Sequence, residues 1–485
     1  MHHPADTDMT HTLDPDDWQA FRERARSMLE DVLDYMEGYR EGPVWNDPAG
    51  FQSALENAEA GAGAEASDAA LRALLPYGVG NTHPRFFGWV HGAGTPAGLM
   101  AEMTASALNA NCGGRKHAAI RIERDIIDYS LRTFGLPDTG SGLITSGTSM
   151  ATFIALKTAR DKAANFSIGE TGLNNAPDLV GYASSGIHAC FDRAFDMLGL
   201  GRVALRKLPQ DENHRMCPEA LKKAIAEDRA AGKTPFAICA TAGSVNRGAI
   251  DDLRAIGEIA QSERIWYHVD AAFAAALQLS DTHRSKLDGI ELSDSIGFDF
   301  HKWLQVNYDA GCVLIRDRED QLRAFSDRPD YLADAGRGLG SDMPWPVDFG
   351  PELSRGFRAL KVWTQMIEFG PEKLAQIVDQ NIEQAAYLAE RVSALPEFDL
   401  LSYAGLNICC FRYTPEGTPD DALDTLNNDI VIALQEQGIA APSTTRIDGK
   451  LAIRVNITNH RTQMSDIDIL IEAVAEIGAG MAAEA

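Results

Sequence analysis

An acidic residue and a lysine, each following a short apolar stretch, give the strongest chemical signal in this sequence. Asp270 ends the strand-like run WYHVD, and Lys302 follows the run SIGF in FDFHKWL. In an open α/β sheet, ligands collect beyond the carboxyl ends of the strands, so both side chains can reach one ligand. A carboxylate can pair with a protonated pyridine nitrogen, and a lysine amine can form an imine. Either residue alone could be an ordinary solvated side chain, but the pair predicts a site for pyridoxal 5′-phosphate (PLP).

A Ser/Gly/Thr turn between a short apolar run and a helical stretch is a second signal. In GLITSGTSMATFIAL (142–156), backbone N–H groups at the helix start and the hydroxyls of Thr148 and Ser149 can hold one phosphate. The turn matches neither the GxxxxGK[ST] loop nor GxGxxG. The alternative is an ordinary helix cap by Ser146 or Thr148.

A histidine at the start of another predicted helix is a weaker signal. His188 lies in YASSGIHACF, where a strand leads into a helix, and a neutral imidazole there could stack on a flat ring. A lone histidine at such a position is more often structural.

These motifs together resemble the group II PLP-dependent amino-acid decarboxylases, which include aromatic amino-acid, histidine and glutamate decarboxylases. The resemblance extends over about 70–475 and implies the aspartate-aminotransferase-like fold, fold type I. The segments that carry it, in the family's order and spacing, are THPRFFGW (82–89), TSGTSMAT (145–152), HVDAA (268–272), HKW (301–303) and LSRGFRALKVW (353–363).

The resemblance implies a role for each site residue. Lys302 would form the Schiff base, Asp270 would face the pyridine nitrogen, and His188 would stack on the ring; these three form the catalytic set. The remaining implied contacts are Ala272 on the other ring face, Thr241 near the ring, Thr148, Ser149 and His301 at the phosphate, and Arg454, His83 and Asn111 at the substrate, with no metal.

The implied reaction is decarboxylation of an L-amino acid to its amine and CO₂ through a quinonoid intermediate. Many relatives carry a tyrosine in a mobile loop that is thought to return the proton, but the corresponding stretch DMPWPVDFG (342–350) has none, and Tyr331 is out of register. Two alternatives therefore stay open: a PLP-dependent aldehyde synthase, and a decarboxylase-like scaffold that binds PLP without turnover.

Two further departures from the family concern charge. Asp299 and Phe300 stand where many relatives have Asn-Pro, and we expect Asp299 to point away from the phosphate because like charges repel. The stretch NANCGGRKH (109–117) is polar where some relatives supply aromatic contacts. It suggests a substrate smaller or more polar than dopa or tryptophan, with Arg115 and Lys116 either meeting an acidic side chain or forming a solvated turn.

Short apolar runs alternate with helical patterns, which predicts a large, mostly parallel sheet of seven strands in an α/β layer structure. The predicted strands are 142–145, 179–183, 203–205, 236–240, 265–269, 295–298 and 312–315, and the predicted helices are 96–111, 117–134, 149–163, 187–198, 218–231 and 251–262.

The chain is expected to divide into three parts. Residues 1–93 form an N-terminal helical dimerisation segment with a helix at 15–41 and one or two short helices at 50–75, and 94–350 form the large PLP-binding domain, ending in a mobile loop at 330–350. Residues 351–485 form a small α/β domain, with helices at 352–394, 419–438 and 465–479 and strands at 406–411 and 451–456. The resemblance implies a homodimer with shared active sites.

Composition limits the partners and the location. The net charge of −26 argues against nucleic acid and anionic lipid as partners. The seven cysteines include no CxxC pair, so reduced cysteines without a disulfide or zinc framework are expected. The acidic N-terminus lacks a signal-peptide pattern and no long apolar run occurs, so a cytoplasmic location is expected.

Overall fold

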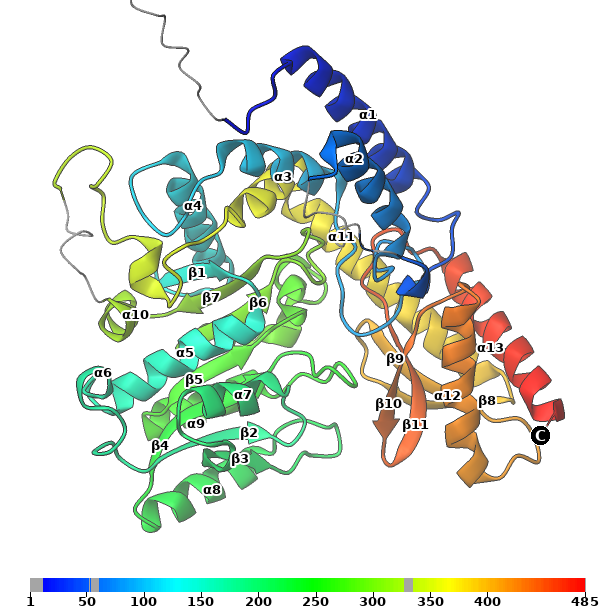
Figure 1. Ribbon diagram of the computed structural model, residues 1–485. Coiled ribbons are helices and arrows are strands. Elements are labelled where there is room, and N and C mark those ends of the chain that lie inside the picture. The colour runs from blue at the N-terminus through cyan, green and yellow to red at the C-terminus, as the bar shows by residue number, and fades with distance from the viewer. Residues whose placement is uncertain (1–11, 52, 54–60, 327–334, 485) are drawn as a thin grey trace, which may run out of the picture.

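The central element is a seven-stranded sheet in the order β1-β7-β6-β5-β4-β2-β3 (Figure 1). The computed structural model describes residues 12–51, 53, 61–326 and 335–484. Strands β3, β2, β4, β5 and β6 run parallel, and β7 is antiparallel to both of its neighbours. This is the expected mostly parallel α/β sheet. The strands are β1 (Ser141–Thr145), β2 (Leu179–Ser184), β3 (Leu205–Leu208), β4 (Thr234–Thr241), β5 (Trp266–Asp270), β6 (Ser295–Asp299) and β7 (Gly311–Ile315).

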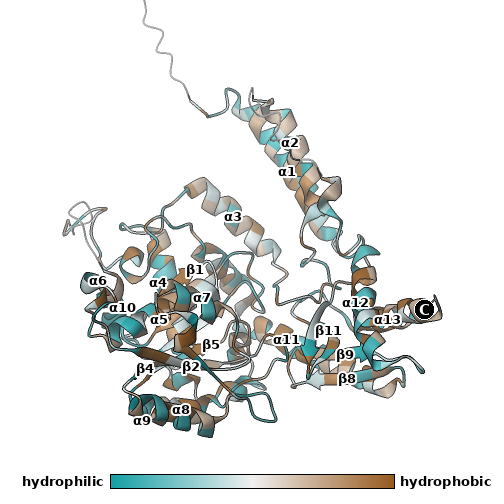
Figure 2. Ribbon diagram, turned by 60° about the horizontal axis from the view of Figure 1, so that its bottom comes forward, coloured by the Kyte–Doolittle hydropathy of each residue, from teal (hydrophilic) through white to brown (hydrophobic). Residues whose placement is uncertain are grey.

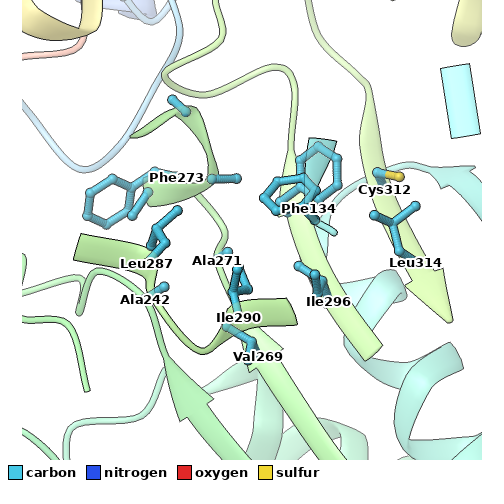
Figure 3. Packing of buried hydrophobic residues seen from close by; sticks show 14 of the residues in the cluster. Phe134, Ala242, Val269, Ala271, Phe273, Leu287, Ile290, Ile296, Cys312 and Leu314 are labelled. Carbon is cyan, nitrogen blue, oxygen red and sulfur yellow. The ribbon is translucent and has the colours of Figure 1, made fainter. Parts of the chain in front are cut away.

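Side chains alternate between two cores, one on each face of this sheet, because successive strand residues point in opposite directions. Val269, Ile296 and Leu314 lie side by side on three neighbouring strands and pack into one core (Figure 3). Cys239 and Val313 point into the other. The first core is closed by helices α4 (Ala118–Thr133), α8 (Pro218–Ala230) and α9 (Leu253–Glu263), and the second by α5 (Thr148–Ala163) and α7 (Cys190–Met197). Both faces are therefore covered, which explains why the central strands are apolar throughout.

The C-terminal part forms its own four-stranded antiparallel sheet in the order β10-β11-β9-β8. Helix α11 (Ala359–Ala394) leads into it from the large domain, and Gly370, at φ 68°, breaks this helix just before Pro371. The other elements here are β8 (Phe398–Tyr403), β9 (Ile408–Tyr413), α12 (Asp420–Glu436), β10 (Ser443–Ile447), β11 (Lys450–Asn456) and α13 (Met464–Glu484).

Two N-terminal helices, α1 (Trp18–Glu37) and α2 (Gly63–Leu74), lie side by side and project from the body of the molecule (Figure 2). Ion pairs join them, from Arg24 to Asp68 at 2.6 Å and from Arg72 to Asp31 at 2.5 Å. No residue of α1 is buried, and Trp18 and Phe21 are exposed on it. The next helix, α3 (Pro96–Leu108), packs against α11.

Several predicted elements differ in their bounds. The strand predicted at 203–205 is a 3₁₀ turn at Arg202–Ala204, and β3 begins only at Leu205. The helix predicted from 187 begins at Cys190, and the one predicted from 352 begins at Ala359. Strands β8 and β10 were not predicted.

The loop predicted at 330–350 is only partly described. Residues 330–334, with Tyr331, lie outside the described residues. Residues 335–345 form no helix or strand, and a 3₁₀ helix follows at Pro346–Phe349.

Two short helices, α6 (Ile168–Thr171) and α10 (Arg318–Phe325), complete the large domain. None of the described helices is both long and apolar enough to cross a membrane.

Candidate active site

A cavity of about 400 Å³ opens beyond the carboxyl ends of β4, β5 and β6, next to the start of α5. The parallel direction of these strands brings their ends to one edge of the sheet, as sequence reasoning requires. All eight residues predicted to contact the cofactor line this cavity: Thr148, Ser149, His188, Thr241, Asp270, Ala272, His301 and Lys302.

Asp270 is the last residue of β5, and its carboxylate is buried at the cavity wall. Its Oδ1 accepts a hydrogen bond from the Ala272 N–H at 3.0 Å. Burial raises the pKa of this carboxyl, against the opposing effects of the Lys302 ammonium and the Ala272 N–H. A cation placed beside Asp270 would favour its ionised form, so the site suits a protonated pyridine nitrogen.

Lys302 lies in the loop that follows β6 and faces a carboxylate. Its Nζ is 2.9 Å from Oδ2 of Asp299. Burial lowers the pKa of the Lys302 amine, but the carboxylates of Asp299 and Asp270 outweigh burial, so the pKa is raised above its ordinary value. The amine is therefore held as an ammonium, and Asp299 lies within reach to accept its proton.

The turn from β1 into α5 passes very close to strand β7. A Cβ on Gly311 would lie 2.4 Å from the Cα of Gly147, so this approach requires a glycine in β7. At the start of α5 the Thr148 N–H donates to Oδ1 of Asp299 at 2.7 Å. The Oγ1 atoms of Thr148 and Thr241 are buried at the cavity and have no hydrogen-bond partner among the described residues. Two such hydroxyls fit a polar ligand that would satisfy them.

Two histidines flank the cavity in neutral form. His188 is exposed to it, and its Nδ1 accepts from the Cys190 N–H at 3.2 Å, so the neutral ring carries its proton on Nε2. The Nδ1 of His301 accepts from the Ala310 N–H at 3.0 Å. Burial lowers the pKa of both rings. A neutral His188 can stack on a cationic ring without repelling it.

The expectation that Asp299 points away from the phosphate turn is wrong. Its carboxylate lies between the start of α5 and Lys302, and its side chain is 2% exposed. The N-terminus of a helix carries partial positive charge, and the ammonium carries a full one. Both attract the carboxylate, and the prediction considered neither.

The three residues predicted to contact substrate do not line the cavity. Arg454 is buried, and its guanidinium donates to the carbonyl oxygens of Val245 and Trp89 at 2.6 Å and 2.8 Å, while burial lowers its pKa to about 10. His83 is buried and accepts from the Arg85 N–H. Asn111 is exposed and accepts from the N–H groups of Gly113 and Arg355.

Sequence reasoning missed an aromatic wall beside the cavity. Trp89 and His91 line the cavity, with ring centroids 6.1 Å apart. The ring centroid of Tyr308 lies 5.8 Å from that of His91 and 4.2 Å from that of His301, so Tyr308 contacts both histidine rings. The aromatic residues of FFGWVH (86–91) could have predicted this aromatic wall, but no local sequence pattern predicts that Tyr308 lies next to them.

Comparisons with known proteins agree with this geometry. The family described as the pyridoxal-dependent decarboxylase conserved domain matches residues 55–414. An aromatic-L-amino-acid decarboxylase of Bacillus atrophaeus is 34% identical over 81% of this chain and 82% of its own length. A phenylacetaldehyde synthase of Arabidopsis thaliana is 29% identical over 92% of this chain and 93% of its own.

Solved structures show the same fold. Mouse CSAD superposes with a TM-score of 0.87 at 24% identity, covering 95% of this chain and 99% of its own. Oryza sativa TDC, solved with PLP and tryptamine, superposes with a TM-score of 0.86 at 24% identity, covering 97% of this chain and 100% of its own. The fold is therefore fold type I, as expected. On this family match, on the identity to its members and on the cavity that fits their cofactor, the chain belongs to the pyridoxal-dependent decarboxylase family and is a PLP-dependent carboxy-lyase.

Proposed function

We propose that this enzyme removes the α-carboxylate of an L-amino acid as CO₂ and releases the amine. The observation that carries the proposal is the convergence of Asp270, Lys302 and the start of α5 on one cavity. When bound, PLP supplies a ring that accepts the electron pair left by the departing carboxylate.

The chain's own residues prepare that chemistry. Asp270, buried and ionised beside a cation, would keep the proton on the pyridine nitrogen. Asp299 Oδ2, at 2.9 Å from Lys302 Nζ, can accept the proton that the lysine must lose before it acts as a nucleophile. The Thr148 and Thr241 hydroxyls would donate to the cofactor, and neutral His188 would cover one face of the ring.

We propose a substrate with a planar side chain. Trp89 and His91 line the cavity, and pairs of rings gain about 0.5–1.5 kcal/mol beyond the burial of their area. The basic turn with Arg115 and Lys116 suggested a smaller or more polar substrate, but these residues do not line the cavity of the same chain. The Arg115 guanidinium covers the ring of Trp345 at 4.9 Å, and the Lys116 N–H donates to the Leu339 carbonyl.

An aldehyde synthase is the second candidate. Residues 335–350 contain no tyrosine, and a phenylacetaldehyde synthase is among the relatives. Such an enzyme would consume O₂ and water and release the aldehyde, CO₂, ammonia and hydrogen peroxide. The products therefore distinguish the two reactions.

We also propose that the enzyme is a homodimer whose partner completes the active site. Apolar residues are exposed on α1, α2 and α3: Trp18, Phe21, Leu71, Leu74, Met100, Met103 and Leu108. Sedimentation should report a mass of two chains, and a monomer at micromolar concentration would contradict the proposal. The boundaries at 93 and 350 and a cytoplasmic location stay predictions.

The test uses holoenzyme and a panel of aromatic, imidazole and acidic amino acids. Equal amounts of amine and CO₂ are expected from a planar substrate. Lys302→Ala should lose both turnover and the long-wavelength absorbance of bound PLP while its far-ultraviolet circular dichroism is unchanged. Unchanged absorbance in this variant would overturn the site, and ammonia and peroxide in place of amine would favour the aldehyde synthase.

A further inference from the structure

A buried carboxylate lies among the groups that should hold the phosphate of the cofactor. Asp299 Oδ1 accepts the Thr148 N–H at 2.7 Å, and its Oδ2 is 2.9 Å from Lys302 Nζ and 3.8 Å from His301 Nε2. Thr148 begins α5, a helix of 16 residues whose N-terminus attracts anions. An anion is thus built into the anion-binding end of this helix.

We propose that Asp299 weakens the hold of this enzyme on the phosphate group of PLP. The inference rests on the cofactor site and does not depend on which reaction the enzyme catalyses. Asp299 would lower the affinity for the cofactor in two ways: by its negative charge, and by accepting the Thr148 N–H that a phosphate would otherwise use.

Two physical effects carry the proposal. First, Asp299 and a phosphate compete for the Thr148 N–H, which can make one strong hydrogen bond at a time. Second, a carboxylate and a phosphate repel one another, and burial of the Asp299 side chain, which is 2% exposed, reduces the screening of this repulsion by solvent. The Lys302 ammonium offsets part of this repulsion, but it pairs with Asp299 only while the amine keeps its proton. An asparagine in this place would keep the shape, remove the charge and offer an N–H₂ donor.

The same contacts allow a rival explanation, in which Asp299 serves only as the proton acceptor of Lys302. The two explanations differ for pyridoxal, which has the same ring and aldehyde but no phosphate. If Asp299 acts on the phosphate, Asp299→Asn tightens PLP binding and leaves pyridoxal binding nearly unchanged. If it acts only on Lys302, the substitution changes both affinities by the same factor.

The experiment measures dissociation constants of PLP and pyridoxal by absorbance titration of protein freed of cofactor, without substrate. The readout is the dissociation constant of pyridoxal divided by that of PLP. Free pyridoxal cyclises internally, but this changes its apparent dissociation constant by the same factor for every variant and so cancels when variants are compared. We expect Asp299→Asn to raise this ratio at least tenfold over the wild type. Inorganic phosphate, titrated by calorimetry, should likewise bind the variant at least tenfold more tightly.

The matched control is Asp294→Asn, which removes the same charge just before the other end of β6, where Asp294 accepts the Tyr267 N–H. Its ratio should stay within twofold of the wild type. Asp299→Ser removes the charge with a smaller side chain and serves as a second variant if the asparagine variant fails to fold. A ratio within twofold of the wild type in a folded Asp299 variant overturns the proposal, even if activity changes.

Discussion

The buried ion pair between Arg355 and Glu123 should hold the loop before α11 against strand β1, which leads into the turn at the start of α5. Arg355 Nη2 lies 2.6 Å from Glu123 Oε1, and Nη1 lies 3.0 Å from Oε2. The two side chains are 1% and 6% exposed. The guanidinium also donates to the carbonyl oxygens of Cys112 and Ile144, and Ile144 belongs to β1. One buried cation therefore joins three separate segments of the chain.

Replacing Arg355 with methionine keeps an unbranched, flexible stem but removes the guanidinium group and its charge. Glu123 would then stay buried, and the Ile144 N–H, at 2.9 Å, would be the hydrogen-bond donor that the described part of the chain still offers it. Removing one partner of a buried pair costs about 3–5 kcal/mol. For a cooperative unit of roughly 150–250 residues, each kcal/mol lowers the melting temperature by about 2–4 °C, so Arg355→Met should lower it by roughly 6–20 °C.

The assay is thermal unfolding of holoenzyme, followed by circular dichroism at one saturating PLP concentration, because bound cofactor itself stabilises the fold. The double variant Glu123→Met with Arg355→Met removes both charges and should recover most of the loss, since apolar replacements of buried pairs are often nearly neutral. The reasoning is refuted if Arg355→Met melts within about 2 °C of the wild type, or if the double variant melts as low as the single one.

Three further predictions concern the cavity and the buried histidines. Asp270→Asn should lower kcat by about 100-fold or more while PLP stays bound, because an amide cannot stabilise charge on the ring; near-normal turnover would mean another partner. Trp89→Ala should raise KM for a planar substrate with a smaller change in kcat; an unchanged KM would exclude ring contact. Burial lowers the pKa of His83 to about 4 and of His268 to about 3. Since the unfolded chain binds these protons near pH 6.5, stability should fall as pH drops from 6.5 toward 4, and His83→Gln should flatten this slope in melting curves; an equal slope would refute it.

The fold could be predicted largely because the central strands are buried on both faces. Strands such as β4 and β7 contain short, continuous apolar runs, a pattern that local sequence reveals. Strands β8 and β10 are the edges of the small sheet, and their side chains are only partly buried. Their mixed sequences, FDLLSY and STTRI, therefore carry no strong periodic signal, and neither strand was predicted.

The convergence of the eight proposed cofactor residues on one cavity could be predicted because each ends or follows a strand or lies at the start of a helix at the same edge of the sheet. Chain direction alone brings Thr241, Asp270 and Lys302 to this edge. The positions of Arg454, His83 and Asn111 depend on how separate elements pack. Arg454, for example, lies in β11 of the second sheet, where its guanidinium meets backbone carbonyls of the first domain. No local pattern reports such contacts.

The error over Asp299 shows how charge has to be argued in a buried site. The prediction considered one pair, carboxylate and phosphate, and concluded that they must separate. A buried charge is placed by all of its neighbours together, and here they include a helix N-terminus, an ammonium and an imidazole. The rule that places Thr241 at the end of β4 and Asp270 at the end of β5 also places Asp299 at the end of β6. Strand position thus determined where the carboxylate lies, and repulsion from the phosphate must appear instead as a change in cofactor affinity.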